Sequence, residues 1–461
     1  MLTSLVFFAR PVLAAALAWL CIAPAVAASS AAAPRAEVWL ALSDIHLDLF
    51  DDSPDPNSYG LDANPALLHS ALARMKRAEP NPAVVLLPGD FLMHDFALHL
   101  GANDGSPNDA ALRSMRWIAA MLGRAFPKAQ FAIAAGNNDV PCGDYRSANG
   151  SAYLRSVASI WAPLVNRHGA APGFAASFAR AGHYTASLPV HGLRLVVLNT
   201  VLFSSQYRGN CGAGDARAPS AELSWLNATL RTTPSGTRNV VMMHVPPGFD
   251  AFSTEYVRGF LAWPYLKPRY TNELVGALAS PENRVVYAIA GHAHRFDFRL
   301  AGDVPIVVLG SLSPLFDNNP AFYALKIAPD GSLGDVDLYA LDGRSAAWMP
   351  PRSFDRTWGV RSLDGASLAL LHARLAQEPE MRRQWDLQNI GWAPDRATLR
   401  GTWERDSWRV AWCAQRLPIA NFAECAGIGN RVRILPVLLA AAAAAVMLLI
   451  VLAVVRARAR R

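Results

Sequence analysis

The sequence predicts an α/β fold: a layered β-sandwich core flanked by helices, then a small helical subdomain and one transmembrane helix. Three observations support this class. Short apolar runs rich in valine and isoleucine recur through the first two thirds of the 461 residues, helical patterns separate several of them, and polar motifs follow the runs directly. Strands that alternate with helices in this way indicate a layered α/β arrangement.

The apolar runs are predicted to be strands buried on both faces, because they are short, continuous and bounded by turn residues. They are VWLAL before Ser43, AVVLL before Pro88, FAIAA before Gly136, LRLVVL before Asn199, NVVMM before His244, VVYAIA before Gly291 and PIVVL before Gly310. In such sheets ligands bind where the carboxyl ends of the strands emerge, and the polar motifs stand at those ends.

Helical patterns between the strands cover residues 65–77, 109–124, 152–166 and 221–232. From 322 to 341 the pattern changes to two alternating segments around Pro-Asp-Gly, which predicts a β-hairpin that completes a domain spanning residues 36–345. The tryptophan-rich segment that follows predicts a small helical C-terminal subdomain over residues 346–431.

The two ends of the chain predict export and tethering. Arg10 precedes an apolar stretch and small residues near Ala27, which is the pattern of a signal peptide over residues 1–28; an uncleaved anchor helix is the alternative. Residues 434–455 hold no charge and suffice to cross a bilayer, and the basic tail 456–461 predicts a cytoplasmic end. We expect a single-pass membrane protein whose domain at residues 36–345 is extracytoplasmic, that is periplasmic, extracellular or luminal.

The formal net charge of +7 does not by itself indicate nucleic-acid binding. Much of the excess lies in the arginines at the C-terminus, and no basic stripe interleaves with aromatic residues in the middle of the chain. Because a nucleic-acid footprint needs basic residues clustered on one face, we expect no nucleic acid among the partners.

Four cysteines remain once Cys21 is removed with the signal peptide. An even number in an exported chain favours disulfides, although four cysteines allow three connectivities and buried free thiols are the alternative. The pairing that we favour joins Cys413 to Cys425 locally, and Cys142 would then pair with Cys211.

Metal-capable side chains stand in short clusters, each at the end of a predicted strand: Asp44 and His46, Asp90, Asn137, His244, and His292 and His294. Asp44 and His46 are separated by one residue, so both can reach one ion, and the two oxygens of Asp90 can bridge two ions. Carboxylates, an amide and imidazoles together suit a pair of divalent cations, and such pairs hydrolyse phosphate esters. Each cluster alone is weak evidence for metal binding. The prediction of a two-metal site depends on all of them occurring in this order.

With these motifs the chain resembles the calcineurin-like metallophosphoesterase superfamily and, within it, the acid sphingomyelinase-like phosphodiesterase branch. The closer similarity is carried by SDIHLD (43–48), GDFLMHD (89–95), HVPPG (244–248) and GHAHRFDF (291–298). The resemblance implies one metal held by Asp44, His46, Asp90 and His294, and a second held by Asp90, Asn137, His244 and His292. It also implies hydrolysis of a phosphodiester, in a lipid head group or a nucleotide, by metal-activated hydroxide. Zinc is the favoured metal, with manganese or iron as alternatives.

One motif departs from the family pattern. Where the family usually has Gly-Asn-His, this chain has Gly136-Asn137-Asn138, and Asn138 can donate hydrogen bonds but cannot act as a general acid. The resemblance assigns the leaving-group role instead to His94; a loop histidine that caps a helix is the alternative for that residue.

This departure leaves two other functions open. Endopolyphosphatases, which are membrane-anchored relatives, share the Gly-Asn-Asn-Asp variant, so polyphosphate is an alternative substrate, although no basic groove for a long polyanion is evident in the sequence. A non-catalytic metal-binding ectodomain is the second alternative. The altered Asn138 favours it, and the intact set of ligands opposes it.

Overall fold

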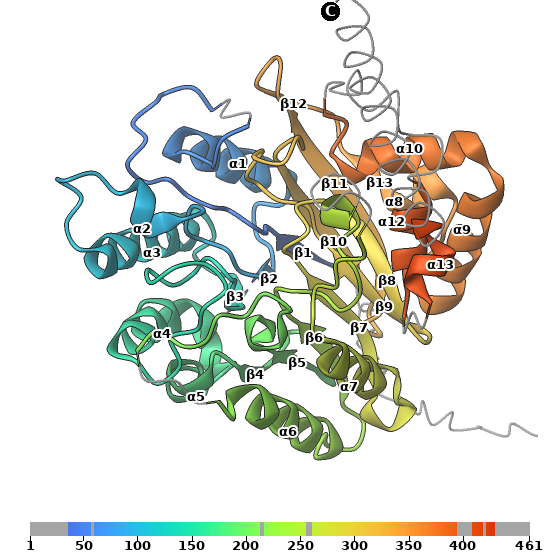
Figure 1. Cartoon of the computed structure of the whole chain (residues 1–461), viewed down its shortest axis with the longest axis horizontal. Coiled ribbons are helices and arrows are strands. Elements are labelled where there is room, and N and C mark those ends of the chain that lie inside the picture. Colours follow the sequence, from blue (N-terminus) through green and yellow to red (C-terminus); the bar gives the residue numbers. More distant parts are fainter. Residues whose placement is uncertain are drawn as a thin grey trace, which may run out of the picture. The chain divides into compact units, whose positions relative to one another are not determined.

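The computed structural model describes residues 36–56, 60–212, 216–254, 261–393, 408–417 and 421–428. Within these ranges two β-sheets form the centre of the fold, and helices lie on their outer sides (Figure 1). The mixed α/β architecture with flanking helices confirms the layered core predicted from the sequence. The predicted signal peptide (1–28), transmembrane helix (434–455) and basic tail (456–461) lie outside the described residues.

The first sheet has the strand order β12-β11-β10-β1-β2-β3, with β13 paired to β11. Its strands are β1 (Glu37–Ala41), β2 (Val84–Leu87), β3 (Gln130–Ile133), β10 (Ala321–Ile327), β11 (Leu333–Asp342), β12 (Ala347–Trp348) and β13 (Arg352–Ser353). Strands β1, β2 and β3 are parallel, whereas β10 runs antiparallel to β1 with Ala41 opposite Tyr323. The predicted hairpin is β10–β11, which adds to this sheet beside β1.

The second sheet has the strand order β14-β8-β9-β7-β6-β5-β4. Its strands are β4 (Tyr184–Ser187), β5 (Leu193–Val197), β6 (Arg238–Met242), β7 (Val285–Ala290), β8 (Asp297–Ala301), β9 (Val304–Val308) and β14 (Arg416–Leu417). The four strands β5, β6, β7 and β9 are parallel, so their carboxyl ends meet at one edge.

Both faces of the parallel strands are buried, which explains their continuous apolar runs. In β6, Val240 and Met242 join the large core shared with the first sheet, while Val241 packs with α6 and α7 on the other side. Successive side chains point to opposite faces of a strand, so one apolar run supplies both layers.

Several of the described helices begin at a side-chain cap. Asn64, Ser106 and Ser151 each accept a hydrogen bond from a backbone N–H in the first turn of α1, α3 and α4. The bounds are α1 (Pro65–Ala78), α2 (Phe96–His99), α3 (Pro107–Ala125), α4 (Ala152–Val165), α5 (Phe174–Ala181), α6 (Ala218–Arg231), α7 (Pro268–Ala279), and the 3₁₀ segments η1 (Arg167–Gly169), η2 (Thr200–Phe203) and η4 (Pro281–Asn283).

The segment after the hairpin contains α8 (Phe354–Trp358), α9 (Gly365–Gln377), α10 (Pro379–Asn389), α12 (Trp408–Ala414) and α13 (Phe422–Cys425). It also supplies edge strands to both sheets, because β12 and β13 pair with β11 and β14 pairs with β8. Among the described residues no helix combines the length and apolar character needed to cross a bilayer.

Both favoured disulfides are formed. Cys142 is bonded to Cys211 across 69 residues, and Cys413 is bonded to Cys425 across 12 residues. The first bond joins the loop after β3 to the loop that precedes α6, where Ser147 and Asn210 also pair as an isolated bridge.

Because a cross-link restricts the unfolded chain more when the loop is longer, we expect the two disulfides to contribute unequally to stability. Replacing Cys142 and Cys211 together by serine is expected to lower the free energy of unfolding by about 4 kcal/mol, and replacing Cys413 and Cys425 by about 3 kcal/mol. Chemical denaturation of both double variants, followed by tryptophan fluorescence, checks the order. A larger loss from the local pair would contradict the loop-length explanation.

Candidate metal centre

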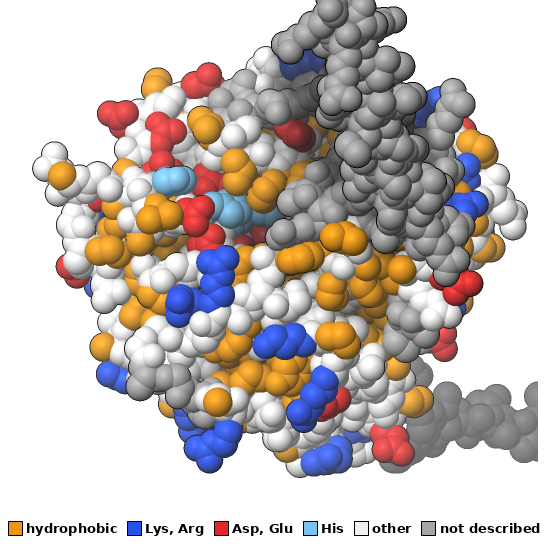
Figure 2. Space-filling model, in the orientation of Figure 1, with side chains coloured by type: hydrophobic (Ala, Val, Ile, Leu, Met, Phe, Trp, Pro, Cys, Tyr) orange, Lys and Arg blue, Asp and Glu red, His pale blue; other side chains and the backbone are white. Residues whose placement is uncertain are grey.

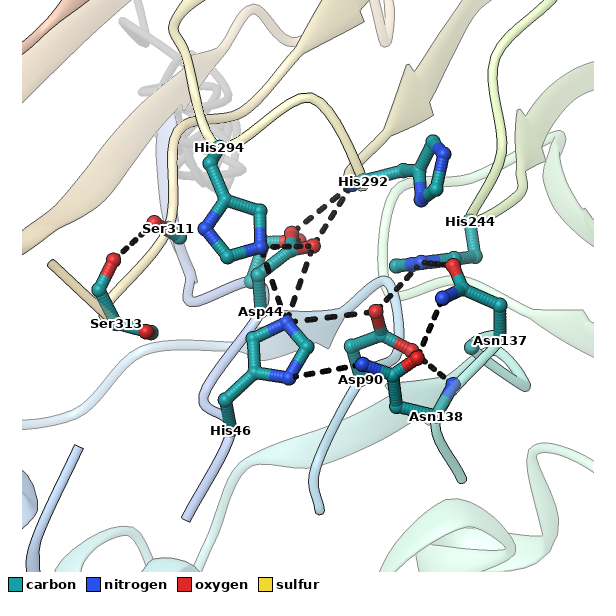
Figure 3. Close-up of polar contacts among 12 residues, drawn as sticks. Asp44, His46, Asp90, Asn137, Asn138, His244, His292, His294, Ser311 and Ser313 are labelled. Carbon is teal, nitrogen blue, oxygen red and sulfur yellow. Dashed lines mark hydrogen bonds and ion pairs between the residues drawn. The ribbon is translucent and has the colours of Figure 1, made fainter. Parts of the chain in front are cut away.

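The predicted ligands come together in loops that leave the carboxyl ends of parallel strands (Figure 3). Asp44 and His46 follow β1, Asp90 follows β2, Asn137 follows β3, His244 follows β6, and His292 and His294 follow β7. The structure therefore places side chains from both sheets at one edge, as the strand-end positions predict.

The first group of donors contains His46, His294, Asp44 and Asp90. The Nε2 atoms of His46 and His294 lie 3.0 Å apart, and His46 Nε2 lies 3.4 Å from Asp90 Oδ2. Asp44 Oδ1 is 3.6 Å from His294 Nε2 and 4.0 Å from His46 Nε2. Asp44, His46 and His244 are fully buried, so these atoms converge away from bulk water.

The second group shares Asp90. His244 Nε2 lies 3.0 Å from Asn137 Oδ1 and 3.1 Å from Asp90 Oδ2. Ligand atoms of Asp90, His244 and His292 all lie within 4.8 Å of one another. One oxygen of Asp90 thus faces both groups, which is the placement expected of a bridging carboxylate.

The tautomers of two histidines follow from their backbone contacts. His46 Nδ1 is 3.0 Å from the carbonyl oxygen of Leu92, and His244 Nδ1 is 3.0 Å from that of Pro88. A carbonyl only accepts, so each Nδ1–H donates and each neutral ring presents an Nε2 lone pair to the cluster. Lone pairs of nitrogen and oxygen then face one another, and a cation or a proton has to lie between them.

The donor separations fit divalent metals. Ligands that bind one ion at about 2.1 Å lie about 3.0 to 3.4 Å apart in tetrahedral or octahedral geometry. The closest donor pairs of both groups fall at 3.0 to 3.4 Å. A set of imidazole, carboxylate and amide donors suits Zn²⁺, Mn²⁺ or Fe²⁺.

Burial and neighbouring charge shift the titration of these groups in the metal-free chain. Burial raises the pKa of Asp44 to about 6 and lowers the pKa of His292 to about 3. Burial also opposes protonation of His244, but the carboxylate of Asp90 outweighs it and raises the pKa of His244 to about 9. Metal binding at His244 therefore has to displace a proton.

The backbone is strained where it presents the ligands. Five of them lie in the left-handed region with φ from 43° to 71°: Asp44, His46, Asp90, His292 and His294. Such conformations cost non-glycine residues about 1–3 kcal/mol each, and they persist only where the surroundings hold them. Hydrogen bonds from the His292 N–H to both oxygens of Asp44 (2.9 and 3.0 Å) are part of that support.

Asp139 ties the loops after β2 and β3 together. Its carboxylate accepts hydrogen bonds from the N–H groups of Asp90 (3.0 Å), Phe91 (2.6 Å) and Gly136 (2.7 Å). Burial raises the pKa of Asp139 to about 7, and these donors oppose that rise. Asp139 thus supports the backbone that carries Asp90.

Asn138, which replaces the usual histidine, is buried and points into this network. Its N–H donates to Asp90 Oδ1 at 2.8 Å, and its Oδ1 accepts from Asn137 Nδ2 at 2.5 Å. The second contact turns Asn137 Oδ1 toward His244. The contacts of Asn138 therefore orient two ligands.

His94 lies beside the first group and has a carboxylate partner. Its ring stacks on His46 with centroids 3.8 Å apart, and its Nδ1 is 2.9 Å from Asp62 Oδ1. Asp62 also accepts from the His94 N–H at 2.8 Å and from Ser313 Oγ at 3.1 Å. Sequence reasoning missed Asp62, because it stands 32 residues before His94 in a loop without a motif.

Aromatic rings border the centre. Phe316 meets His294 and His94 edge-on, at 4.7 and 5.5 Å between centroids, and Tyr145 and Tyr265 meet His292 in the same way. On the face shown in Figure 2, histidine and acidic side chains reach the surface next to hydrophobic ones. His94 and His292 are partly exposed, so the centre is not sealed from solvent.

The comparisons with known proteins agree with this geometry. The sequence profile of the calcineurin-like phosphoesterase family matches residues 39–296. This chain belongs to the calcineurin-like phosphoesterase family. Family membership accounts for the order of the ligand motifs and confirms the superfamily expected from them.

Among curated proteins, this phosphoesterase-family chain is similar to acid sphingomyelinase-like enzymes. It is 27% identical to sphingomyelinase phosphodiesterase D of Dictyostelium discoideum over 317 residues, which cover 64% of this chain and 66% of that protein. It is 25% identical to acid sphingomyelinase-like phosphodiesterase 3b of Mus musculus over 392 residues, which cover 76% of this chain and 81% of that protein. These relatives agree with the branch expected from the motifs.

Proposed function

We propose that the chain is a dinuclear-metal phosphodiesterase, sphingomyelinase-like in its chemistry, that hydrolyses a diester of a lipid head group or a nucleotide. The placement of Asp90 carries this proposal, because one carboxylate oxygen lies between the Nε2 atoms of His46 and His244, at 3.4 and 3.1 Å. Names of the curated relatives support a diester as the substrate class.

One ion would be held by Asp44, His46, Asp90 and His294, and the other by Asp90, Asn137, His244 and His292. Bound divalent ions supply an acidified water and charge compensation for phosphoryl oxygens. Zinc is the metal we propose, because imidazoles contribute four of the seven ligands.

His94 is proposed to protonate the leaving oxygen. Its Nδ1–H donates to Asp62 Oδ1, which leaves Nε2 as the atom that can carry a proton to the substrate. Asp62 acts through His94 and is therefore a positioning residue. About one fifth of the His94 side chain is exposed (21%), so substrate can reach it, whereas Asn138 is buried.

A leaving-group comparison tests this role. His94→Gln is expected to lower kcat for an alkyl phosphodiester by about 100-fold or more, because an alkoxide needs a proton to depart. The loss with bis(p-nitrophenyl) phosphate is expected to be much smaller, since p-nitrophenolate leaves unprotonated. Asp62→Asn should show the same pattern more weakly, and His168→Gln, at an exposed histidine, should change neither rate. Equal losses on both substrates would point to a structural role for His94.

The function itself is tested with a substrate panel. Purified full-length protein with added Zn²⁺ or Mn²⁺ is assayed on bis(p-nitrophenyl) phosphate, sphingomyelin, nucleotide diesters and polyphosphate. Hydrolysis of a diester supports the proposal, and cleavage of polyphosphate alone supports the endopolyphosphatase alternative. No turnover on any of them despite two bound ions would support a non-catalytic metal-binding ectodomain.

We further propose that the chain is exported and held at a membrane by residues 434–455. The charge-free length of this segment and the arginines after it support the proposal, as does an even set of paired cysteines. In intact cells, added protease is expected to cleave an epitope inserted after residue 35 and to spare a tag at the C-terminus. Cleavage of the C-terminal tag, or protection of both, would contradict the proposal.

A further inference from the structure

A groove of about 900 Å³ lies between α3 and α4 and carries four arginines: Arg116, Arg124, Arg155 and Arg167. Among the described residues that line it, none is acidic and none is a predicted metal ligand. The groove is therefore a separate feature from the metal centre, and neither the fold nor the proposed hydrolysis accounts for it.

Two of the groove arginines, Arg155 and Arg167, lie in a basic stretch of the sequence. Residues 145–214 contain six arginines and no lysine, aspartate or glutamate, which gives this stretch a formal charge of +6. The stretch includes all of α4, and the second half of α3 adds Arg116 and Arg124 without an acidic neighbour. The fold brings the two arginines in the second half of α3 beside Arg155 of α4 and Arg167 of η1.

The arginines are not neutralised by carboxylates. Arg155 donates to the carbonyl of Gly150 at 2.8 Å, and Arg167 donates to the carbonyls of Phe126 (3.0 Å) and Ala129 (2.6 Å). In the part of the chain that the structure describes, no ion pair involves any of the four. Arg116, Arg124 and Arg155 are exposed, so their guanidinium groups are available to an anion.

The groove also has an apolar floor. Ala119, Ile160 and Leu164 line it beside the exposed Pro163. Guanidinium groups suit phosphate because their planar fork of donors matches phosphate oxygens. An inorganic anion would leave the apolar floor in water, whereas a phosphate that carries hydrocarbon would cover it. The combination fits an anionic amphiphile.

We propose that the α3–α4 groove binds the head group of an anionic phospholipid, with the phosphate among the arginines and the glycerol and first methylenes on the apolar floor. This site is independent of the metal centre. It would hold the folded domain against an anionic lipid surface whatever ester the metal centre cleaves.

The test uses the full chain in a neutral detergent and three probes: dihexanoyl phosphatidylglycerol, dihexanoyl phosphatidylcholine and glycerol 3-phosphate. The groove variant combines Arg116→Gln, Arg124→Gln and Arg155→Gln. A control variant with the same change of net charge combines Arg77→Gln, Arg231→Gln and Arg344→Gln, which are exposed arginines on other elements. Affinity is measured by thermophoresis at constant detergent, and thermal unfolding shows that each variant is folded.

We expect phosphatidylglycerol to bind the natural chain and the control variant equally, and the groove variant about 100-fold more weakly, because each hydrogen bond from an arginine to the phosphate contributes about fivefold. Phosphatidylcholine and glycerol 3-phosphate should bind far more weakly than phosphatidylglycerol. Hydrolysis of bis(p-nitrophenyl) phosphate should be the same in all three proteins. Equal loss in both variants, unchanged binding in the groove variant, or glycerol 3-phosphate binding as tightly as the lipid would each overturn the proposal.

Discussion

Replacing Asp90 with asparagine is expected to lower the hydrolysis of bis(p-nitrophenyl) phosphate by about 1000-fold, which corresponds to about 4 kcal/mol. The Oδ2 atom of Asp90 lies 3.4 Å from His46 Nε2 and 3.1 Å from His244 Nε2, so its charge serves both groups of donors. Asparagine has the same shape, but it removes the charge and places an N–H₂ donor where one of the oxygens stood. Steady-state kinetics of the purified variant measure the loss.

Measuring the metal content of the variant distinguishes loss of a shared ligand from unfolding of the chain. The Asp90→Asn variant is expected to retain fewer than two transition-metal ions per chain, measured by elemental analysis after dialysis, while its thermal unfolding stays cooperative. Asp337→Asn is the matched control, because Asp337 pairs with Lys326 on the first sheet and touches no predicted ligand. Two retained ions with full activity in Asp90→Asn would refute the shared-carboxylate arrangement.

The strands and helices could be predicted where local pattern and burial agree. Val240, Val241 and Met242 form one apolar run that contributes to two buried layers. The start of α1 is marked by Asn64, whose side chain caps the helix, and by Pro65 at the first helical position. Strand β8 could not be predicted from such a pattern. Asp297 and Arg299 are buried in this strand as an ion pair, and Gln415 donates a hydrogen bond to Asp297 at 2.8 Å. Because charged residues interrupt its apolar pattern, the sequence does not indicate a buried strand here.

The convergence of the candidate metal ligands could be predicted because each cluster follows an apolar run directly, and parallel strands bring such positions to one edge. The contacts that loop residues make could not be predicted from the sequence. Asp62 contacts His94 although it lies 32 residues earlier in the chain, and Asn138 holds its neighbour Asn137 in place. No residue spacing in the sequence indicates either contact. The arginine groove was missed for the same reason, since Arg124 and Arg155 become neighbours only when α3 packs on α4.

The backbone around Asp90 leaves no room for a side chain at Gly136. A Cβ there would lie 2.2 Å from the backbone nitrogen of Asp90 and 2.8 Å from its Cα, and 2.1 Å from its Oδ1. Backbone cannot rotate away as a side chain can, so Gly136→Ala has to push the two loops apart. The hydrogen bonds from the N–H groups of Asp90 and Phe91 to Asp139 hold those same loops together and would be strained with them.

Gly136→Ala is therefore expected to lower the free energy of unfolding by about 3 kcal/mol and, in the folded fraction, to lower activity by about 100-fold or more through displacement of Asp90. Gly365→Ala is the matched control, because its Cβ would meet the backbone oxygen of Asp303 at 2.1 Å, a comparable clash away from the ligands. That variant should lose stability but keep its metal content and its activity per folded molecule. Denaturation curves, elemental analysis and kinetics on both proteins separate a general packing defect from displacement of the shared carboxylate. Equal specific activity in the two variants would show that the close approach of Gly136 to Asp90 does not position the metal centre.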